Sequence, residues 1–81
     1  MRVRFIKGQT FYNELFVVNR GDFEMARVLV DPKTGLHDAT AFDWTKGPPY
    51  SVETIASQVT LAEARKAVKD YLEPLPEPPA Y

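Results

Sequence analysis

A single segment near the end of the chain constrains the fold most, because its own residues specify where a helix begins and ends. Thr60 and Glu63 form a T-x-x-E capping box, in which each side chain accepts a hydrogen bond from the backbone N–H of the other residue. The apolar residues that follow recur at helical spacing: Leu61, Ala64, Val68, Tyr71 and Leu72. Pro74 disfavours helical geometry at the residue before it, so we expect the helix to end there. An amphipathic helix of this kind needs a second layer to cover its apolar face.

The residues before the helix predict that second layer as an antiparallel sheet. Alternating, β-branched and aromatic runs favour strands at residues 2–7, 11–19, 23–30, 36–44 and 50–56. Asp31, Pro32 and Gly35 are typical of a tight turn and predict a hairpin between the third and fourth strands. The third run also contains residues that suit a helix, and Ser51 could begin a helix in place of the last strand. The sequence predicts an α+β fold: a meander of four to five antiparallel strands with one C-terminal amphipathic helix packed on one face.

Length and composition limit the kinds of protein that the chain can be. Its 81 residues fit one domain, expected at residues 1–73, followed by a proline-rich tail at 74–81 that we expect to be extended or disordered. The absence of cysteine excludes disulfides, thiolate metal sites and a thiol nucleophile. The formal net charge of -1 is unusually balanced for a protein whose main partner is a phosphate backbone. No run approaches the roughly 18 apolar residues of a membrane span, and we expect a cytoplasmic protein.

His37 and Asp38 are the first candidates for catalysis, since a histidine beside a carboxylate can act as a general base. Adjacent residues of a strand point to opposite faces, however, so the two side chains cannot easily meet. Asp31 and Asp43 would add carboxylates to a metal site, but the spacing does not fit a calcium loop and one histidine is too few for zinc. We therefore expect no catalytic residue, no metal, no cofactor and no enzymatic activity.

The N-terminal strand is a candidate surface for nucleic acid, which is the alternative function. Its basic residues Arg2, Arg4 and Lys7, together with Arg20, could neutralise phosphates. The aromatic residues suited to stacking on bases are Phe5, Phe11 and Tyr12. Acidic residues are expected close by on the neighbouring strands, namely Glu14, Asp22 and Glu24. A solvated edge strand would explain the same basic residues.

A protein-binding surface is the function that the sequence favours. Strand alternation places Phe42 and Trp44 on the face opposite to Ala39 and Ala41, whose small side chains could admit a closely packed helix. Large aromatic residues flanked by acids are typical of interfaces. The expected contact residues are Trp44, Phe42 and Tyr50 as anchors, with Asp38 and Asp43 pairing with basic groups of the partner. For Trp44, a place in the core is the alternative, because a small domain needs its aromatic residues inside.

The expected partner is a larger protein or ribonucleoprotein complex, whereas direct binding to nucleic acid is disfavoured and no membrane partner is expected. A homodimer is a further option, because a sheet with a free edge can pair with a second copy. The segment TLAEARKAVKDYL resembles the helix of many small phage and mobile-element proteins, in which a short antiparallel sheet accompanies one such helix. Anti-CRISPR proteins include members with this architecture. The resemblance covers about residues 50–72 by pattern, and the rest by size and strand content. It implies a phage-encoded inhibitor that sterically blocks a surface of a host defence complex in the host cytoplasm.

Overall fold

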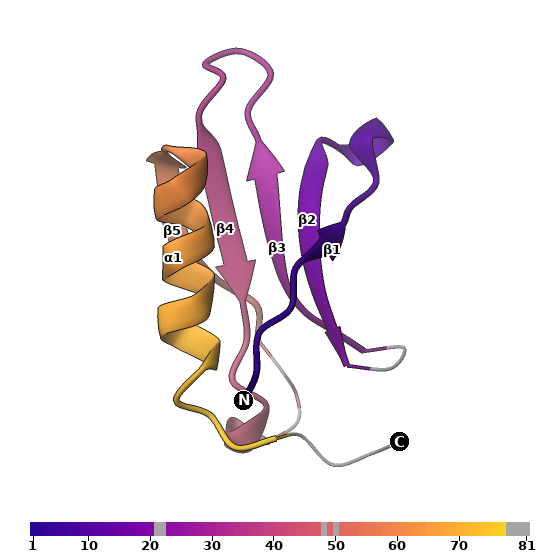
Figure 1. Ribbon diagram of the computed structural model, residues 1–81, viewed down its shortest axis with the longest axis vertical. Helices are drawn as coiled ribbons and strands as arrows, with labels where there is room; N and C mark the ends of the chain where they lie inside the picture. Colours follow the sequence, from indigo (N-terminus) through magenta and orange to yellow (C-terminus); the bar gives the residue numbers. More distant parts are fainter. Residues whose placement is uncertain (21–22, 48, 50, 78–81) are drawn as a thin grey trace.

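In the described part of the chain, a five-stranded antiparallel sheet is followed by one C-terminal helix (Figure 1). The computed structural model describes residues 1–20, 23–47, 49 and 51–77. The strands are β1 (Ile6–Lys7), β2 (Glu14–Arg20), β3 (Phe23–Val30), β4 (His37–Ala41) and β5 (Glu53–Val59), and the helix is α1 (Leu61–Leu72). Two short 3₁₀ helices interrupt them, η1 (Thr10–Tyr12) and η2 (Trp44–Lys46). Each strand pairs with the next along the chain, so the sheet is a meander and the predicted α+β fold is confirmed.

The helix α1 covers the face of the sheet on which the alanines of β4 lie. The predicted capping box is present: Thr60 accepts from the backbone of Glu63, and Glu63 accepts from the backbone of Thr60. In the sheet, Ala39 and Ala41 of β4 are almost fully buried. The helix α1 packs mainly against β4 and β5. Small side chains on a strand allow a helix axis to approach closely, and the core forms between these two layers. Figure 1 shows α1 in front of β4 and β5.

The N-terminal segment is extended but joins the sheet only at its end. A strand was expected over residues 2–7, and pairing with β2 is limited to Ile6 and Lys7. The preceding residues still alternate: Met1, Val3 and Phe5 are half-buried against the core, whereas Arg2 and Arg4 are exposed. This segment runs beside α1 on the same face of the sheet, as Figure 1 shows. Its apolar side chains are therefore held by core packing rather than by strand pairing.

The second predicted strand begins three residues later than expected. Residues 11–13 do not extend β2, because Thr10–Tyr12 form η1 and Asn13 adopts a left-handed conformation with φ 58°. The strand also continues to Arg20, one residue beyond the predicted end. The aromatic pair FY favours a strand by composition, but the hydrogen bonds of the connection from β1 to β2 override that preference.

The fourth and fifth strands also differ in their bounds. β4 ends at Ala41 rather than residue 44, because Asp43 caps η2 by accepting hydrogen bonds from the backbone N–H (2.8 Å) and the hydroxyl of Thr45. β5 spans Glu53–Val59 instead of residues 50–56, and the alternative helix from Ser51 is wrong. The hairpin between β3 and β4 is confirmed, with Gly35 at φ 74° and its N–H donating to the Asp31 carbonyl.

The segment after α1 folds back onto the domain. Leu75 packs against the core, and the ammonium group of Met1 donates to the carbonyl oxygens of Glu73 (2.7 Å) and Leu75. The indole N–H of Trp44 donates to the carbonyl of Pro76 at 3.3 Å. The contacts of the domain therefore extend beyond residue 73, to residues 75, 76 and 77 in the part of the chain that is described.

Candidate functional site

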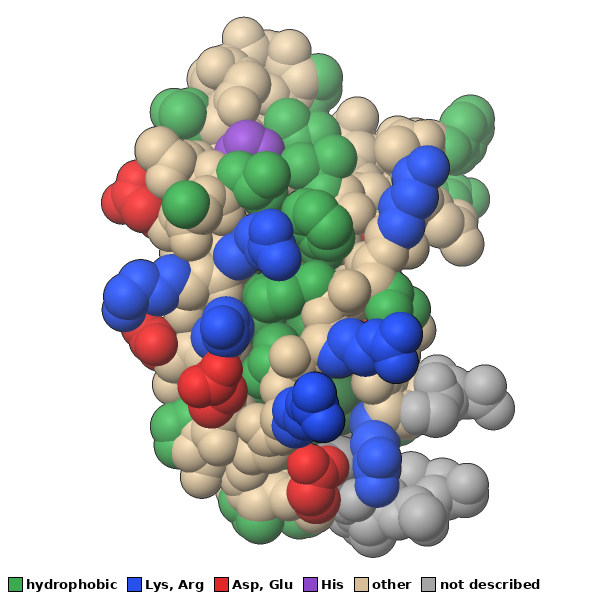
Figure 2. All heavy atoms as spheres, in the orientation of Figure 1, with side chains coloured by type: hydrophobic (Ala, Val, Ile, Leu, Met, Phe, Trp, Pro, Cys, Tyr) green, Lys and Arg blue, Asp and Glu red, His purple; other side chains and the backbone are tan. Residues whose placement is uncertain are grey.

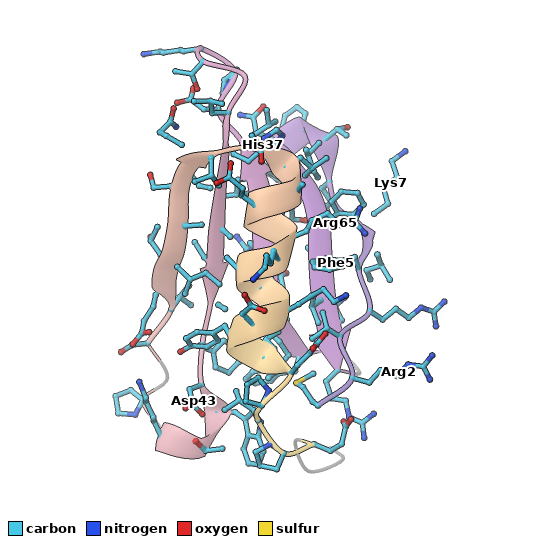
Figure 3. The ribbon with its side chains drawn as sticks, turned by 60° about the vertical axis from the view of Figure 1, so that its left-hand side comes forward. Arg2, Phe5, Lys7, His37, Asp43 and Arg65 are labelled. Atoms are coloured by element: carbon cyan, nitrogen blue, oxygen red, sulfur yellow. The ribbon has the colours of Figure 1, made fainter. Side chains whose placement is uncertain are left out.

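The side chains of the adjacent residues His37 and Asp38 make no hydrogen bond with each other in the described part of the chain. The carboxylate of Asp38 accepts a hydrogen bond from the backbone N–H of Gln58 on the neighbouring strand, at 2.9 Å. The Nδ1 atom of His37 is buried and has no hydrogen-bond partner among the described residues. Figure 3 shows His37 and Asp43 at opposite ends of the molecule. Within the described ranges, no three or more His, Asp or Glu residues come together in a way that could hold a metal ion.

The aromatic anchors expected for a protein partner are not brought together on an open surface. Phe42 is 5% exposed and packs edge to face against Phe23, with ring centroids 5.1 Å apart. Trp44 is half-buried against the core and holds the C-terminal segment through Pro76. Tyr50 lies outside the described residues. Among the described anchors, Phe42 therefore serves packing, and Trp44 contributes one contact to the chain itself.

The two acids expected to flank those anchors have partners within the chain. Asp38 is bound to the backbone of Gln58, and Asp43 is bound to Thr45. The hydroxyl and N–H of Thr45, and more weakly the charge of Lys46, hold the pKa of Asp43 below its ordinary value. Both carboxylates stabilise local backbone, in β5 and in η2 respectively.

A groove lies between α1 and the N-terminal segment, and it has a cationic border. This hollow, of about 650 Å³, is lined by Val3, Phe5, Ala62, Arg65, Lys66, Lys69, Asp70 and Glu73. We call it the cationic groove. Figure 2 shows a column of hydrophobic side chains down this face with Lys and Arg side chains on both sides of it. In the same view the acidic side chains lie to the left of the column and near its lower end, and Lys and Arg side chains line the rest of its right side.

Arg65 lines the cationic groove and lies over two aromatic rings. Its guanidinium carbon lies 4.9 Å from the ring centroid of Phe5 and 4.9 Å from that of Phe16. The two rings meet edge to face, with centroids 6.0 Å apart. A guanidinium over aromatic faces is attracted by their quadrupoles and keeps a fixed orientation while its outer side stays open to solvent. Figure 3 shows Arg65 reaching from α1 towards Phe5 of the N-terminal segment.

A second hollow adjoins the N-terminal segment and collects further arginines. It is lined by Met1, Arg2, Val3, Arg4, Asn19, Arg20 and Glu77. We call it the arginine hollow. Glu77 is the acid in its lining, and its carboxylate accepts a hydrogen bond from the backbone N–H of Arg2 at 3.2 Å. An anionic group thus already occupies part of this hollow, supplied by the chain's own C-terminal segment.

The charges of the protein are segregated, although their sum is close to zero. Six of its ten Lys and Arg residues line the two hollows, against three of its eleven Asp and Glu residues. Within the described ranges, no carboxylate lies within ion-pair distance of the side chains of Arg2, Arg4, Lys7, Arg20 and Arg65. Elsewhere Arg27 pairs with Glu14 and Glu24, and its pKa is raised chiefly by the hydrogen bond to Glu24. Among the described residues, five of the six cations without an ion-pair partner therefore belong to the N-terminal segment, β1, the end of β2 and α1, and the sixth, Lys33, lies in the hairpin between β3 and β4.

Sequence reasoning found part of this surface and missed part of it. Arg2, Arg4, Lys7 and Arg20 were predicted as one basic group, and the structure brings Arg2, Arg4 and Arg20 together in the arginine hollow. The contribution of α1 was missed, because the helical pattern places Arg65 among the polar residues of the helix, where an arginine is common. Its spacing four residues after Leu61, on the edge of the apolar stripe, is the signal that could have found it.

Comparisons with protein-family models, curated proteins and solved structures found no match for this chain. Nothing in them links it to the phage proteins that were expected from the sequence of its helix. Among the described residues, no helix is both long and apolar enough to span a membrane. The function is therefore argued from the residues of the chain itself.

Proposed function

We propose that this protein is a non-catalytic binding module for nucleic acid, and that the cationic groove and the arginine hollow form its contact surface. The proposal rests on one observation: arginines without a carboxylate partner among the described residues line both hollows, Arg65 in the cationic groove and three more in the arginine hollow, and the two linings share Val3. Such a surface attracts a partner with regularly spaced negative charge and offers apolar contact between the charges. We assign this binding to the cytoplasm.

The balanced net charge does not oppose this proposal. Phosphate binding depends on the local field, which a one-sided arrangement of cations produces even where distant acids balance the total. The arginines of the surface suit phosphate oxygens, because a guanidinium presents several donors in a planar fork. On the helix wall, Lys66 pairs with Asp70 at 2.6 Å and Lys69 with Glu73 at 3.8 Å, so Arg65 is the strongest candidate there.

A protein partner has less support from the geometry. The anchors expected for it are divided between the core, an internal contact and a residue outside the described ranges. A protein with an acidic surface would use the same cations, however. The experiment below supplies an oligonucleotide as the only ligand, so it tests nucleic acid and not an acidic protein.

The test measures binding of a short labelled oligonucleotide by fluorescence anisotropy across a range of salt concentrations. We expect measurable binding at low salt, with log K falling against log salt by about 0.7 per phosphate contact for a single strand and about 0.9 for a duplex. The double variant Arg4→Ala, Arg20→Ala removes two cations of the arginine hollow and should reduce that slope by about 1.4 on a single strand.

The matched control is Lys33→Ala with Lys46→Ala, which removes the same charge from the hairpin and from η2, outside both hollows. Its slope should equal that of the unmodified protein. Absence of any binding at low salt would overturn the proposal. Equal slopes for the two double variants would show that the attraction is general and does not belong to this surface.

A further inference from the structure

The connection between β1 and β2 presents two aromatic side chains to solvent. Phe11 is 87% exposed and Tyr12 is 68% exposed, which makes them the two most exposed of the large hydrophobic residues in the described part of the chain. Their rings meet at right angles, with centroids 5.1 Å apart and an interplanar angle of 89°. Most of each ring surface therefore remains available to a partner.

The backbone that carries this pair is fixed by a dense set of hydrogen bonds. Tyr12 N–H donates to the carbonyl of Gln9 at 3.0 Å, and Asn13 N–H donates to that of Thr10 at 3.0 Å. Below them Glu14, which is 8% exposed, accepts from the N–H of Gln9 at 3.1 Å. The connection is thus held by backbone hydrogen bonds within the turn and by the buried carboxylate of Glu14.

Two further contacts anchor the same connection to the sheet. The N–H of Gly8 donates to the Leu15 carbonyl at 2.9 Å, and the N–H of Val30 in β3 donates to the Asn13 carbonyl at 2.9 Å. The second carboxylate oxygen of Glu14 faces the Nε of Arg27 at 3.3 Å. A loop that exposed aromatic residues by chance would not need this support, whereas a binding loop gains affinity from a fixed conformation.

The position of the pair continues the cationic surface. Lys7 immediately precedes the connection and lies only four residues before Phe11, which limits their separation to about 14 Å along the backbone. Figure 3 shows Lys7 pointing away from the body of the protein on the side of the N-terminal segment, as Arg2 does. A partner held by these cations can therefore reach the two rings.

We infer that Phe11 and Tyr12 form a stacking platform for unpaired bases, so that the ligand of the surface is single-stranded nucleic acid. This inference rests on the proposed function and names the form of nucleic acid bound. Every base has a flat π-face that stacks on an aromatic ring, and in a single strand that face is accessible. In a duplex the same faces are buried in the base stack, so a duplex can use the cations but not the rings.

The test compares a labelled oligothymidine strand with a duplex of the same length at one salt concentration. The unmodified protein should bind the strand more tightly than the duplex. Phe11→Ala with Tyr12→Ala should weaken binding of the strand by about fivefold or more, since the loss of one stacked base costs at least about that much, and should leave binding of the duplex unchanged. Both side chains are exposed, so the fold should survive, which circular dichroism and thermal unfolding would verify.

A matched variant separates stacking from general apolar contact. Phe11→Leu with Tyr12→Leu keeps the apolar character and removes the rings, and it should bind as weakly as the alanine variant, whereas Tyr12→Phe should bind normally. If the strand binds the unmodified and alanine proteins equally, the platform is refuted and the proposed function stands. Full affinity in the leucine variant also refutes stacking. If the unmodified protein binds neither strand nor duplex, both proposals fail together.

Discussion

The carboxylate of Glu77 accepts a hydrogen bond from the backbone N–H of Arg2, 3.2 Å away, inside a hollow that Arg4 and Arg20 also line. The first and last described parts of the chain thus meet at a cationic site, and the chain itself supplies the anion. A phosphate that enters this hollow must displace that carboxylate or share the site with it.

We predict that Glu77→Gln increases the affinity for a short oligonucleotide. The amide keeps the size of the side chain but removes a negative charge that competes with phosphate, and exposed charge interactions of this kind amount to at most about 1 kcal/mol, or about fivefold. The measurement is anisotropy at low salt. Glu53→Gln, an exposed acid that pairs with Lys46 away from the hollow, is the control and should show no increase. Unchanged affinity in Glu77→Gln would mean that the tail does not compete.

Gly8→Ala should destabilise the connection that carries Phe11 and Tyr12. A Cβ at this position would lie 2.6 Å from Cγ and 2.7 Å from the carbonyl oxygen of Glu14, and the carbonyl belongs to the backbone of β2 and cannot simply rotate away. We expect a loss of about 1–3 kcal/mol in the free energy of unfolding, which urea denaturation would measure.

The informative comparison for that variant is Gly35→Ala. A Cβ at Gly35 meets nothing within 4 Å, so its cost arises from the positive φ alone and should be about 1 kcal/mol. Only the substitution at Gly8 should also weaken oligonucleotide binding, because only Gly8 supports the aromatic pair. A normal binding curve for a destabilised Gly8→Ala protein would argue against that link.

Ala39→Leu should destabilise the protein by about 1–3 kcal/mol, because it adds volume where α1 meets β4. Ala39 and Ala64 have no exposed surface, so the larger side chain can be accommodated only by moving the helix. Thermal and urea unfolding would measure the change. Ala62→Leu, on the exposed side of α1, is the control with the same chemical change and should stay within about 0.5 kcal/mol of the parent.

The turn between β3 and β4 should make stability depend on acid pH. The N–H of Lys33 and, more weakly, the side chain of Gln58 donate to Asp31 and hold the pKa of its carboxyl below the ordinary value. A carboxyl with a depressed folded-state pKa contributes stability above its unfolded pKa of about 3.9, and that stability is lost as pH falls through the folded pKa.

The corresponding experiment is thermal unfolding of the protein and of Asp31→Asn from neutral to strongly acid pH. Asparagine suits the same turn position but does not titrate, so the variant should lose less stability on acidification than the parent. If the stability of both proteins falls equally steeply at acid pH, other carboxyls, such as Asp43, account for the pH dependence.

The parts of the fold that could be predicted are those specified by neighbouring residues. The capping box at Thr60 and the turn at Gly35 need only contacts within a few residues, and both are present. The bounds of β2 could not be predicted, because η1 depends on the buried carboxylate of Glu14 and on β3, whose Val30 N–H donates a hydrogen bond to the carbonyl of Asn13. Local composition favoured a strand there and tertiary contacts decided otherwise.

The same distinction explains the candidate site. Arg2, Arg4 and Lys7 are close in sequence, so their grouping was visible without a structure. Arg65 joins them only because α1 and the N-terminal segment lie side by side on one face of the sheet. The predicted aromatic surface depended on β4 continuing to Trp44, and the capping of η2 by Asp43 ended the strand before that residue.

The contact of Met1 with the carbonyls of Glu73 and Leu75 has a consequence for the order of the elements in the gene. A short linker from the end of the described chain to Met1 would close the backbone into a ring, which could be reopened at the exposed Pro32–Lys33 bond. Such a circular permutant would begin with β4 and end with β3, and every strand would keep its neighbours. The architecture depends on which surfaces meet. The chain could therefore begin at Met1 or at Lys33 without a change in the packing of its elements.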